Sequence, residues 1–588
     1  MNNQAKPRLP FKLGNFSVDD PRPIKVAVIG AGHSGIVAGI RFRQRVQNLD
    51  LTIYDSLAGI GGTWYANRYP GLQCDIPSHA YQPTFESNTE WSAFYATGSE
   101  IQRNLESIVD KYQLRPFIKL QHRLTAARYS EESGKWELTI KHPRKVSETV
   151  KSHENQKSRE NQEWEELHDT VDILFIAVGP LSRWTWPDIP GLESFSGTVV
   201  HSADWNIADD KETLGDKRVG VIGVGSSAIQ IVAALQPKVK HLVNYVRGKT
   251  WIAAIFNKPS LDRVSGDSSV NNYTFTDKDK EAFKDPKIYN EFRREIEQDM
   301  NHAHPATLLG SPLEKMARAE FTESMRQKLA KRPWIADHLI PDFGVCCRRL
   351  TPGPGYLEAL CEDNVTFVPS IIKGVTSKGI ETVDGQFQEL DIIICATGFE
   401  TSYRLDMDIK GRKGVSLNEH HTPHPRTYLS IAVDGFPNMF QALGPNAGVG
   451  AGNLLLIMER QVDYAVAATL KIQRESIKSI EAKQEAVEDF EKYIDTVFGT
   501  KCRSWYKAGK EEGRVVALWP GSPMHAARTL AHPRWEDFNY EYLDSSQNRL
   551  HWLGDGNTVA DKDPEADKGW YLRPEYIDYP PGIFRPLL

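Results

Sequence analysis

A strand that runs into a glycine-rich turn and an apolar-periodic helix occurs twice in this chain, and no other feature restricts the fold as much. The first copy spans residues 24–46 with its turn at 30–35, and the second spans residues 217–235 with its turn at 223–228. Both strands end in an apolar run, which is typical of a parallel sheet covered on both faces. The sequence therefore predicts an α/β fold with two Rossmann-like dinucleotide-binding domains.

The first turn, Gly30-Ala31-Gly32-His33-Ser34-Gly35, has the spacing of a phosphate-binding turn. Glycine is needed where the chain turns sharply and where a pyrophosphate approaches the backbone, so we interpret Gly30, Gly32 and Gly35 as cofactor contacts. The helix that follows would present its positive end to the phosphates. Asp55 ends the next strand, twenty residues after Gly35, where its carboxylate can accept hydrogen bonds from ribose hydroxyls. The alternative is a tight turn without a ligand.

The second turn, Gly223-Val224-Gly225-Ser226, also lies between a strand and a helix, and we interpret Gly223, Gly225 and Ser226 as cofactor contacts. The strand that follows ends in Arg247-Gly248-Lys249, without an acidic residue. A carboxylate there would repel a 2′-phosphate, whereas Arg247 would pair with it. The second turn therefore favours NADPH over NADH, unless Arg247 is only a surface arginine.

The length of the chain, 588 residues, exceeds what one core normally holds. We expect the first part of one nucleotide-binding domain at 1–190, and the second such domain at 200–385 with a charged helical insertion at about 265–335. The chain would return to the first domain at 386–520 and end in an extension at 521–588. These boundaries follow the strands, a linker rich in Pro, Trp and Gly, and the charged helical segment.

The charge balance excludes several classes of partner. The net charge is -6 and the pI is about 6.3, which favours neither nucleic acid nor a membrane surface. No apolar run has the length of a bilayer span, and the start of the chain lacks a signal-peptide core. Six cysteines without a C-x-x-C spacing predict no metal site, reduced thiols and a cytoplasmic location. The polar residues 141–170 predict a solvated loop.

Two longer motifs resemble those of one family. Residues 195–205, FSGTVVHSADW, match F-x-G-x-x-x-H-x-x-x-W, the fingerprint of type I Baeyer–Villiger monooxygenases. Gly61-Gly62-Thr63-Trp64, Tyr69-Pro70-Gly71 and Asp75 resemble the motif [AG]GxWxxxx[FY]P[GM]xxxD of the same family. The similarity extends from about residue 24 to 521, and the tail resembles fungal members of secondary metabolism. The family usually has proline or aspartate after the fingerprint tryptophan, where this chain has Asn206.

The resemblance implies FAD at the first turn, with Gly62, Thr63, Trp64 and Asp75 among its contacts, and NADPH at the second turn. It implies a reaction with O2 that inserts one oxygen atom next to a ketone carbonyl, through a flavin peroxide, and yields an ester or lactone. The alternative is a related flavin monooxygenase that hydroxylates nitrogen or oxidises sulfur. Related enzymes commonly lack the fingerprint tryptophan, so Trp205 favours the Baeyer–Villiger branch.

The resemblance also implies the residues of the reaction. Arg349, in Arg348-Arg349, resembles the arginine of the family's Lys-Arg pair and would stabilise the peroxide anion, because a guanidinium stays protonated at any working pH. Asp75 would hold Arg349, and Arg348 would bind the 2′-phosphate. Trp505 resembles the tryptophan that contacts the nicotinamide ribose, and His201 would couple domain movement rather than transfer protons. The alternative for both arginines is a structural role beside surface carboxylates.

Overall fold

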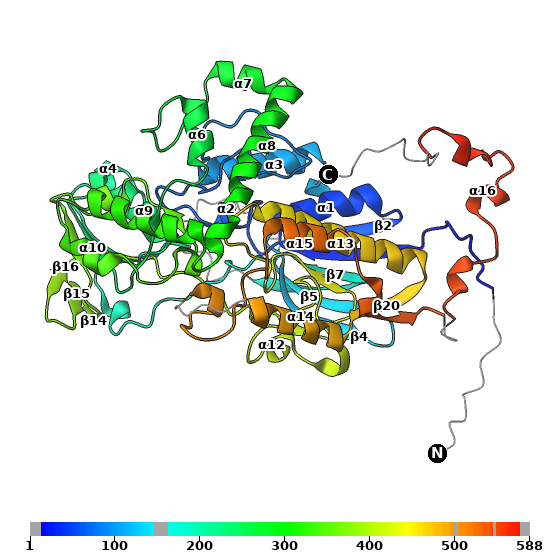
Figure 1. Cartoon of the computed structure of the whole chain (residues 1–588). Coiled ribbons are helices and arrows are strands. Elements are labelled where there is room, and N and C mark those ends of the chain that lie inside the picture. Colours follow the sequence, from blue (N-terminus) through cyan, green and yellow to red (C-terminus); the bar gives the residue numbers. More distant parts are fainter. Residues whose placement is uncertain (1–12, 145–162, 498–503, 545–547, 577–588) are drawn as a thin grey trace, which may run out of the picture.

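The structure is a computed structural model that describes residues 13–144, 163–497, 504–544 and 548–576. Two parallel sheets of five strands each organise the chain, and helices cover them (Figure 1). Each sheet contains one of the two glycine-rich turns. The predicted α/β fold with two Rossmann-like units is therefore confirmed. We call the two sheets, with the helices that cover them, the first unit and the second unit.

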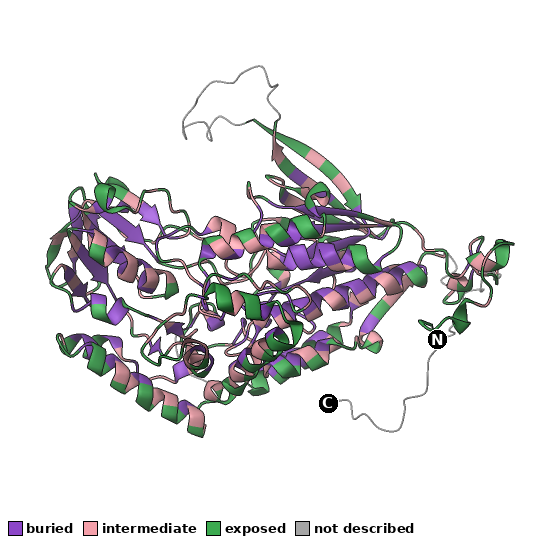
Figure 2. Ribbon diagram, turned by 90° about the horizontal axis from the view of Figure 1, so that it is seen from above, coloured by how far each residue is buried: buried purple, intermediate pink, exposed green. Residues whose placement is uncertain are grey.

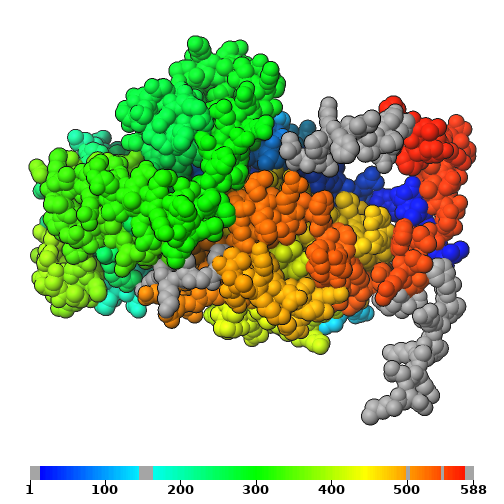
Figure 3. Space-filling model, viewed as in Figure 1, coloured from blue at the N-terminus to red at the C-terminus, as the bar shows by residue number. Residues whose placement is uncertain are grey.

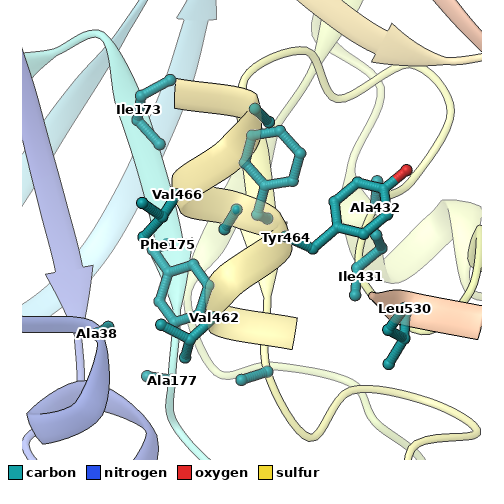
Figure 4. Packing of buried hydrophobic residues seen from close by; sticks show 14 of the residues in the cluster. Ala38, Ile173, Phe175, Ala177, Ile431, Ala432, Val462, Tyr464, Val466 and Leu530 are labelled. Carbon is teal, nitrogen blue, oxygen red and sulfur yellow. The ribbon is translucent and has the colours of Figure 1, made fainter. Parts of the chain in front are cut away.

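The first unit is built on a sheet of order β19-β7-β1-β2-β3. Its strands are β1 (Ile24–Ile29), β2 (Leu49–Tyr54), β3 (Ile118–Lys119), β7 (Ile173–Ile176) and β19 (Met439–Gln441). Helices α1 (His33–Arg45) and α13 (Leu454–Arg474) bury their apolar sides on one face. Figure 4 shows Val462 and Val466 of α13 beside Phe175 of β7. The long helix α13 thereby fixes its own N-terminus near the carboxyl ends of the strands.

A second sheet, of order β18-β4-β5-β6, packs on the other face of the first unit. Its strands are β4 (Arg123–Ser130), β5 (Lys135–Pro143), β6 (Trp164–Val171) and β18 (Asp408–Lys410). The loop predicted over 141–170 is therefore wrong at both ends, and its centre, 145–162, lies outside the described residues. Strand β6 is exposed along most of its length, so it has no apolar alternation by which a strand is recognised in a sequence.

The second unit is built on a sheet of order β13-β10-β9-β17-β8. Its strands are β8 (Thr198–His201), β9 (Arg218–Ile222), β10 (His241–Tyr245), β13 (Val365–Val368) and β17 (Ile392–Cys395). Helix α5 (Ser226–Leu235) follows β9, and β14 (Ile372–Thr376), β15 (Gly379–Thr382) and β16 (Phe387–Glu389) form a small antiparallel sheet. Strand β17 pairs with β9 and β8, so the second unit continues past residue 386, where we expected the return to the first unit.

The helical insertion lies between β11 (Ile252–Ala253) and β12 (Thr351–Pro352), which pair in parallel. It begins earlier than expected, with α6 (Lys258–Ser265), and continues through α7 (Asp277–Phe283), α8 (Pro286–His302), α9 (Pro312–Lys328) and α10 (Trp334–Leu339). Helices α6–α8 pack on α3 (Gly98–Lys111) and its neighbours in the first unit, whereas α9 and α10 pack on the second unit (Figures 1 and 3). One insertion thus contributes to the cores of both units.

The C-terminal part returns to the first unit. Helices α14 (Gln484–Val497) and α15 (Pro523–Leu530) join its core, and β20 (Ile477–Ala482) pairs with β21 (Phe538–Tyr542). Residues 548–576, with the short helix α16 (Val559–Lys562), form an arm that is mostly exposed (Figure 2). The arm is held by the start of the chain, because the Gly14 amide donates to the Gly554 carbonyl at 3.2 Å.

Two sequence expectations concern the chain as a whole. Within the described ranges, no helix combines the length and apolar character needed to cross a membrane. Cys74, Cys346, Cys361 and Cys395 are free thiols, but Cys347 is disulfide-bonded. The expectation that all thiols are reduced is therefore wrong at Cys347, because sequence spacing does not reveal which sulfur atoms meet in space.

Candidate active site

The first glycine turn leaves the backbone bare on the side away from the sheet. A Cβ atom on Gly30 would lie 2.5 Å from the Ala177 carbonyl oxygen, and one on Gly35 would clash with the Gly30 carbonyl. Gly62 opposes this turn, because a Cβ atom on Gly62 would lie 2.9 Å from the Cα atom of Gly32. Two stretches of backbone without side chains therefore face each other at the start of α1, where phosphates can approach closely.

Asp55 lies beside this turn, at the end of β2. Its Oδ2 atom accepts a hydrogen bond from the Ala31 amide at 2.6 Å, and Oδ1 accepts one from the Leu57 amide at 2.7 Å. The side chain is buried, and burial raises the pKa of the carboxyl while the two backbone amides oppose that shift. The carboxylate therefore fastens the glycine turn to β2, and each oxygen keeps further lone-pair capacity for a ligand.

The segment after Gly62 joins the two units. Helix α2 (Thr63–Ala66) begins directly after Gly62, and the Trp64 indole donates to the Tyr81 hydroxyl at 3.2 Å. Farther along, the Tyr69 hydroxyl donates to Oε1 of Gln230 on α5 at 3.0 Å. The φ angle of Gly71 is 79°, and a Cβ atom there would lie 2.8 Å from the Gln230 carbonyl oxygen. The motif that ends at Asp75 therefore docks on the second unit.

Asp75 and Arg349 meet at this junction although they are 274 residues apart. The Nη2 atom of Arg349 donates to both carboxylate oxygens of Asp75, at 2.8 and 2.9 Å. The side chains remain 31% and 23% exposed, so the pair lies at the edge of a cavity rather than inside the core. The attraction of Asp75 raises the pKa of Arg349, so the guanidinium stays charged at every working pH.

Aromatic side chains surround the Arg349 guanidinium. Its carbon lies 5.9 Å from the centre of the Phe256 ring. Tyr506 interacts with Arg349 electrostatically and is buried, and its ring lies 4.6 Å from that of Trp505. A cavity of about 260 Å³ extends from Asp75 between the two units, and its wall includes Gln73, Tyr95, Gln230, Ile255 and Pro352. The site thus combines one fixed cation with neighbouring walls that are largely apolar.

The second glycine turn is open. A Cβ atom on Gly223 would clash with the Ala396 carbonyl, so this glycine lets the turn pack on the sheet. Gly225 is the N-cap of α5 and is exposed, and a Cβ atom there would meet no atom within 4 Å. The Ser226 hydroxyl lies 2.6 Å from that of Thr351. The helix N-terminus is therefore free of covering side chains where a phosphate would bind.

Cationic side chains gather at the end of β10. Arg247 is exposed two residues after the strand. The Nη1 atom of Arg348 donates to the Lys249 carbonyl at 2.9 Å, and its guanidinium carbon lies 5.0 Å from the Phe343 ring centre. The fold thereby brings Arg348 beside the segment that carries Arg247 and Lys249, with Arg349 turned toward Asp75 instead.

His201 and Trp205 lie away from this cavity. His201 is buried at the end of β8, where its ring stacks on Trp184 with 4.2 Å between ring centres. Its Nδ1 atom accepts a hydrogen bond from the Ala203 amide at 3.1 Å, and burial lowers its pKa. The Trp205 indole donates to the Ile207 carbonyl at 2.8 Å. Because burial lowers the pKa and Nδ1 accepts a hydrogen bond, the His201 ring is neutral at neutral pH. Trp205 packs on the core of the second unit.

Sequence reasoning missed three side chains of the site. Gln230 lies four residues after Ser226, on the same face of α5, which is a signal for a second contact from that helix. Tyr506 follows Trp505 directly and interacts electrostatically with Arg349, and its place beside Trp505 is a signal that could have found it. No pattern in the sequence indicated Phe256, because only the fold brings it to Arg349.

Comparisons with known proteins cover nearly the whole chain. Residues 28–97 match the model of an NAD(P)-binding Rossmann-like domain. The chain is 36% identical to the FAD-binding monooxygenase tazF of Aspergillus terreus over 94% of this chain and 95% of that protein. It is 30% identical to a Baeyer-Villiger monooxygenase of Pseudomonas aeruginosa over 85% of this chain and 88% of that protein.

Solved structures give the same result. Cyclohexanone monooxygenase from Rhodococcus sp. Phi1, bound to NADP+, superposes with a TM-score of 0.73 at 28% identity, over 89% of this chain and all of that one. Oxidized steroid monooxygenase bound to NADP superposes with a TM-score of 0.72 at 28% identity, over 88% of this chain and 99% of that one. The likeness therefore includes both units and the insertion between them.

Proposed function

Because the chain belongs to the Baeyer–Villiger monooxygenase family, we propose that it inserts one oxygen atom of O2 next to the carbonyl of a ketone. The product is an ester or a lactone, and the cofactors are FAD and NADPH. The observation that carries this proposal is the ion pair of Arg349 with Asp75, which holds a permanent cation against a residue in the wall of the cavity between the two units.

The first unit fits FAD. Gly30, Gly32, Gly35 and Gly62 leave room for a pyrophosphate between two bare stretches of backbone, since a side chain on any of them would fill that space or clash. Asp55 stands where a ribose would lie, and Thr63 and Trp64 follow Gly62 at the start of α2. We assign this unit to FAD, with residues 1–190 and the chain after β17 as its parts.

The second unit fits NADPH. Gly225 and Ser226 expose the N-terminus of α5, and Arg247 and Arg348 supply positive charge at the end of β10 for a 2′-phosphate. Trp505 packs on Tyr506, which faces Arg349, so Trp505 is placed to contact the nicotinamide end of the cofactor. We assign residues 200 to 395, including the insertion, to this unit.

FAD and NADPH supply the reactive groups, and the protein contributes the charge and the environment around Arg349. Bound FAD, once reduced by NADPH, supplies activated oxygen for the ketone. Arg349 would stabilise the negative charge that develops on the reacting oxygen atoms, and Asp75 holds its guanidinium in one orientation. Phe256 lies beside the guanidinium and Tyr506 is buried near it, and apolar neighbours of this kind strengthen the electrostatic effect of a charge.

Replacing Arg348 with alanine is expected to raise the KM for NADPH about 10- to 100-fold, because a charge-assisted hydrogen bond contributes about 1.5–3 kcal/mol. The KM for NADH should change less than threefold, since NADH has no 2′-phosphate. Both constants can be measured from the oxidation of the nicotinamide in the absence of a ketone. Lys240→Ala is the matched control, because Lys240 is exposed at the opposite end of β10. An equal rise for both cofactors would mean that Arg348 has a structural role.

The activity can be tested with purified protein, NADPH and a panel of cyclic ketones and organic sulfides, with products identified by mass spectrometry. Lactones or esters one oxygen atom heavier than the ketone are expected. Sulfoxides alongside them are compatible with the proposal. Sulfoxides or N-oxides across a broad panel, without any ester, would contradict it and indicate an enzyme that oxidises only soft nucleophiles.

A further inference from the structure

Residues 504–517, which carry Trp505 and Tyr506 to the site, are attached to the loop before α13 and to α14 of the first unit. The first attachment is Asn446, in the loop before α13. Its amide nitrogen Nδ2 donates to the carbonyls of Val515 and Leu518, both at 2.9 Å, and its backbone amide donates to Val516 at 2.7 Å. The Val516 amide in turn donates to the Tyr506 carbonyl at 2.7 Å. The position of Tyr506 therefore depends on the strand-like run that begins at Val515.

The second attachment is a hydrogen-bonded cluster of polar side chains at Arg514, directly before that run. The Nη1 atom of Arg514 donates to Oε2 of Glu491 on α14, and Nη2 donates to the Glu491 carbonyl at 3.2 Å. The imidazole of His424 lies 3.2 Å from the same carboxylate and 3.0 Å from Arg514. We call Arg514, Glu491 and His424 the clamp. The clamp ties this segment to α14.

The clamp is buried, and its side chains do not make all the hydrogen bonds that they could make. The side chains of Arg514 and Glu491 are only 10% and 11% exposed. Oε1 of Glu491 and Nε of Arg514 are buried without a hydrogen-bond partner among the described residues. Three further charged groups act on the cluster. Asp495 on α14 lies 3.6 Å from Arg514, Arg426 in the loop before β19 interacts with Glu491, and Lys510 interacts with His424. A buried cluster of this kind responds strongly to the gain or loss of one proton.

We propose that Arg514, Glu491 and His424 are positioning residues, which hold Tyr506 near Arg349, with Trp505 beside it, and release both when Glu491 loses its proton. The inference rests on the proposed function, in which Trp505 contacts NADPH. The three clamp residues touch neither cofactor nor substrate. They act on the site through Val515 and Val516, which fix the position of Tyr506.

The direction of the pH effect follows from linkage. Burial, opposed only in part by Arg514, raises the pKa of Glu491 to about 7, whereas a solvent-exposed glutamate titrates near about 4.3. Between about pH 4.3 and about pH 7, the Glu491 carboxyl therefore stays protonated while the segment is held and loses its proton when the segment is released. The contribution of Glu491 to clamping is complete below about pH 4 and is lost as the pH rises to about 7. The segment should thus be held more firmly at pH 5.5 than at pH 8.

Hydrogen exchange measured by mass spectrometry on the full-length, FAD-loaded protein tests the clamp without turnover. Protection of peptides from residues 504–517, corrected for intrinsic exchange rates, should fall at least fivefold from pH 5.5 to pH 8. Glu491→Gln, which mimics the protonated side chain, should keep its protection at both pH values. Arg514→Gln should lose protection at both and raise the KM for NADPH at least tenfold, and Arg514→Lys should restore part of both. Wild-type pH dependence in Glu491→Gln would overturn the proposal, as would protection of Arg514→Gln within twofold of wild type.

Trp505→Ala separates the clamp from the proposed function. It should raise the KM for NADPH without changing the pH dependence of exchange in the segment. If Arg514→Gln loses protection while neither it nor Trp505→Ala changes the KM, the clamp stands and the proposed contact of Trp505 with NADPH fails. If Trp505→Ala raises the KM and Arg514→Gln changes nothing, the cofactor contact stands and the clamp fails.

Discussion

Replacing Arg349 with alanine is expected to abolish ester formation from every ketone, while FAD remains bound and NADPH still reduces it. Arg349 is the cation at the cavity, and Asp75 both orients its guanidinium and raises its pKa. Loss of one preorganised donor to a developing negative charge typically costs a factor of about 10²–10³ in kcat, and the loss of a full positive charge costs at least that much. The ester yield should therefore fall below the detection limit of a turnover assay.

The measurement for Arg349 separates the two halves of the reaction. Stopped-flow absorbance gives the rate of flavin reduction, and gas chromatography gives the yield of ester. Arg349→Lys retains a charge but cannot bind both carboxylate oxygens of Asp75 through one planar group, so an intermediate yield is expected. An alanine variant that forms ester within tenfold of the wild-type rate would remove Arg349 from the mechanism.

Alanine at Gly35 and alanine at Gly225 are expected to fail in different ways, although both glycines belong to phosphate-binding turns. A Cβ atom at Gly35 clashes with the backbone carbonyl of Gly30, which cannot move without distorting β1, so the folded state should lose about 3 kcal/mol. At Gly225 a Cβ atom meets nothing within 4 Å, so stability should be unchanged. A methyl group there would instead occupy space that the pyrophosphate of NADPH needs.

Absorbance near the flavin bands and thermal unfolding distinguish the two outcomes. Gly35→Ala should be purified without colour and with a lower unfolding temperature. Gly225→Ala should be yellow and as stable as wild type, with a KM for NADPH raised about tenfold or more, since each tenfold corresponds to about 1.4 kcal/mol. Loss of FAD from Gly225→Ala, or its retention by Gly35→Ala, would show that the two turns have been assigned to the wrong cofactors.

Local features of this fold were predictable, because each glycine turn, its strand and its helix lie within about 25 residues of one another. The turn at Gly30 and the turn at Gly223 both occur where the pattern indicates. Contacts that join distant segments were not visible in the pattern of the residues. Neither the docking of Tyr69 and Gly71 on Gln230 nor the place of Phe256 beside Arg349 leaves a periodic trace.

The pair of Arg349 and Asp75 is an instructive exception. Their separation of 274 residues hides the contact from any local argument, and only the resemblance of two motifs indicated that they meet. The domain boundary predicted at residue 386 was wrong because the local sequence pattern allowed two assignments. Strand β17 is a buried run that fits either sheet, and only its register with β8 and β9 assigns it to the second unit.

Because the insertion packs on two different cores, the chain between α8 and α9 is a hinge. Helices on either side of residues 303–311 are anchored in different cores, one in each unit. This stretch contains the 3-10 helix His304–Thr307 and Gly310, whose φ angle is 78°. Any rotation of one sheet against the other must therefore bend the insertion in these few residues, next to the loop that carries Gly450, and again between β11 and α6. Within the insertion, relative movement of the two nucleotide-binding units is thus confined to the two short stretches that join helices α6–α8 to the second unit.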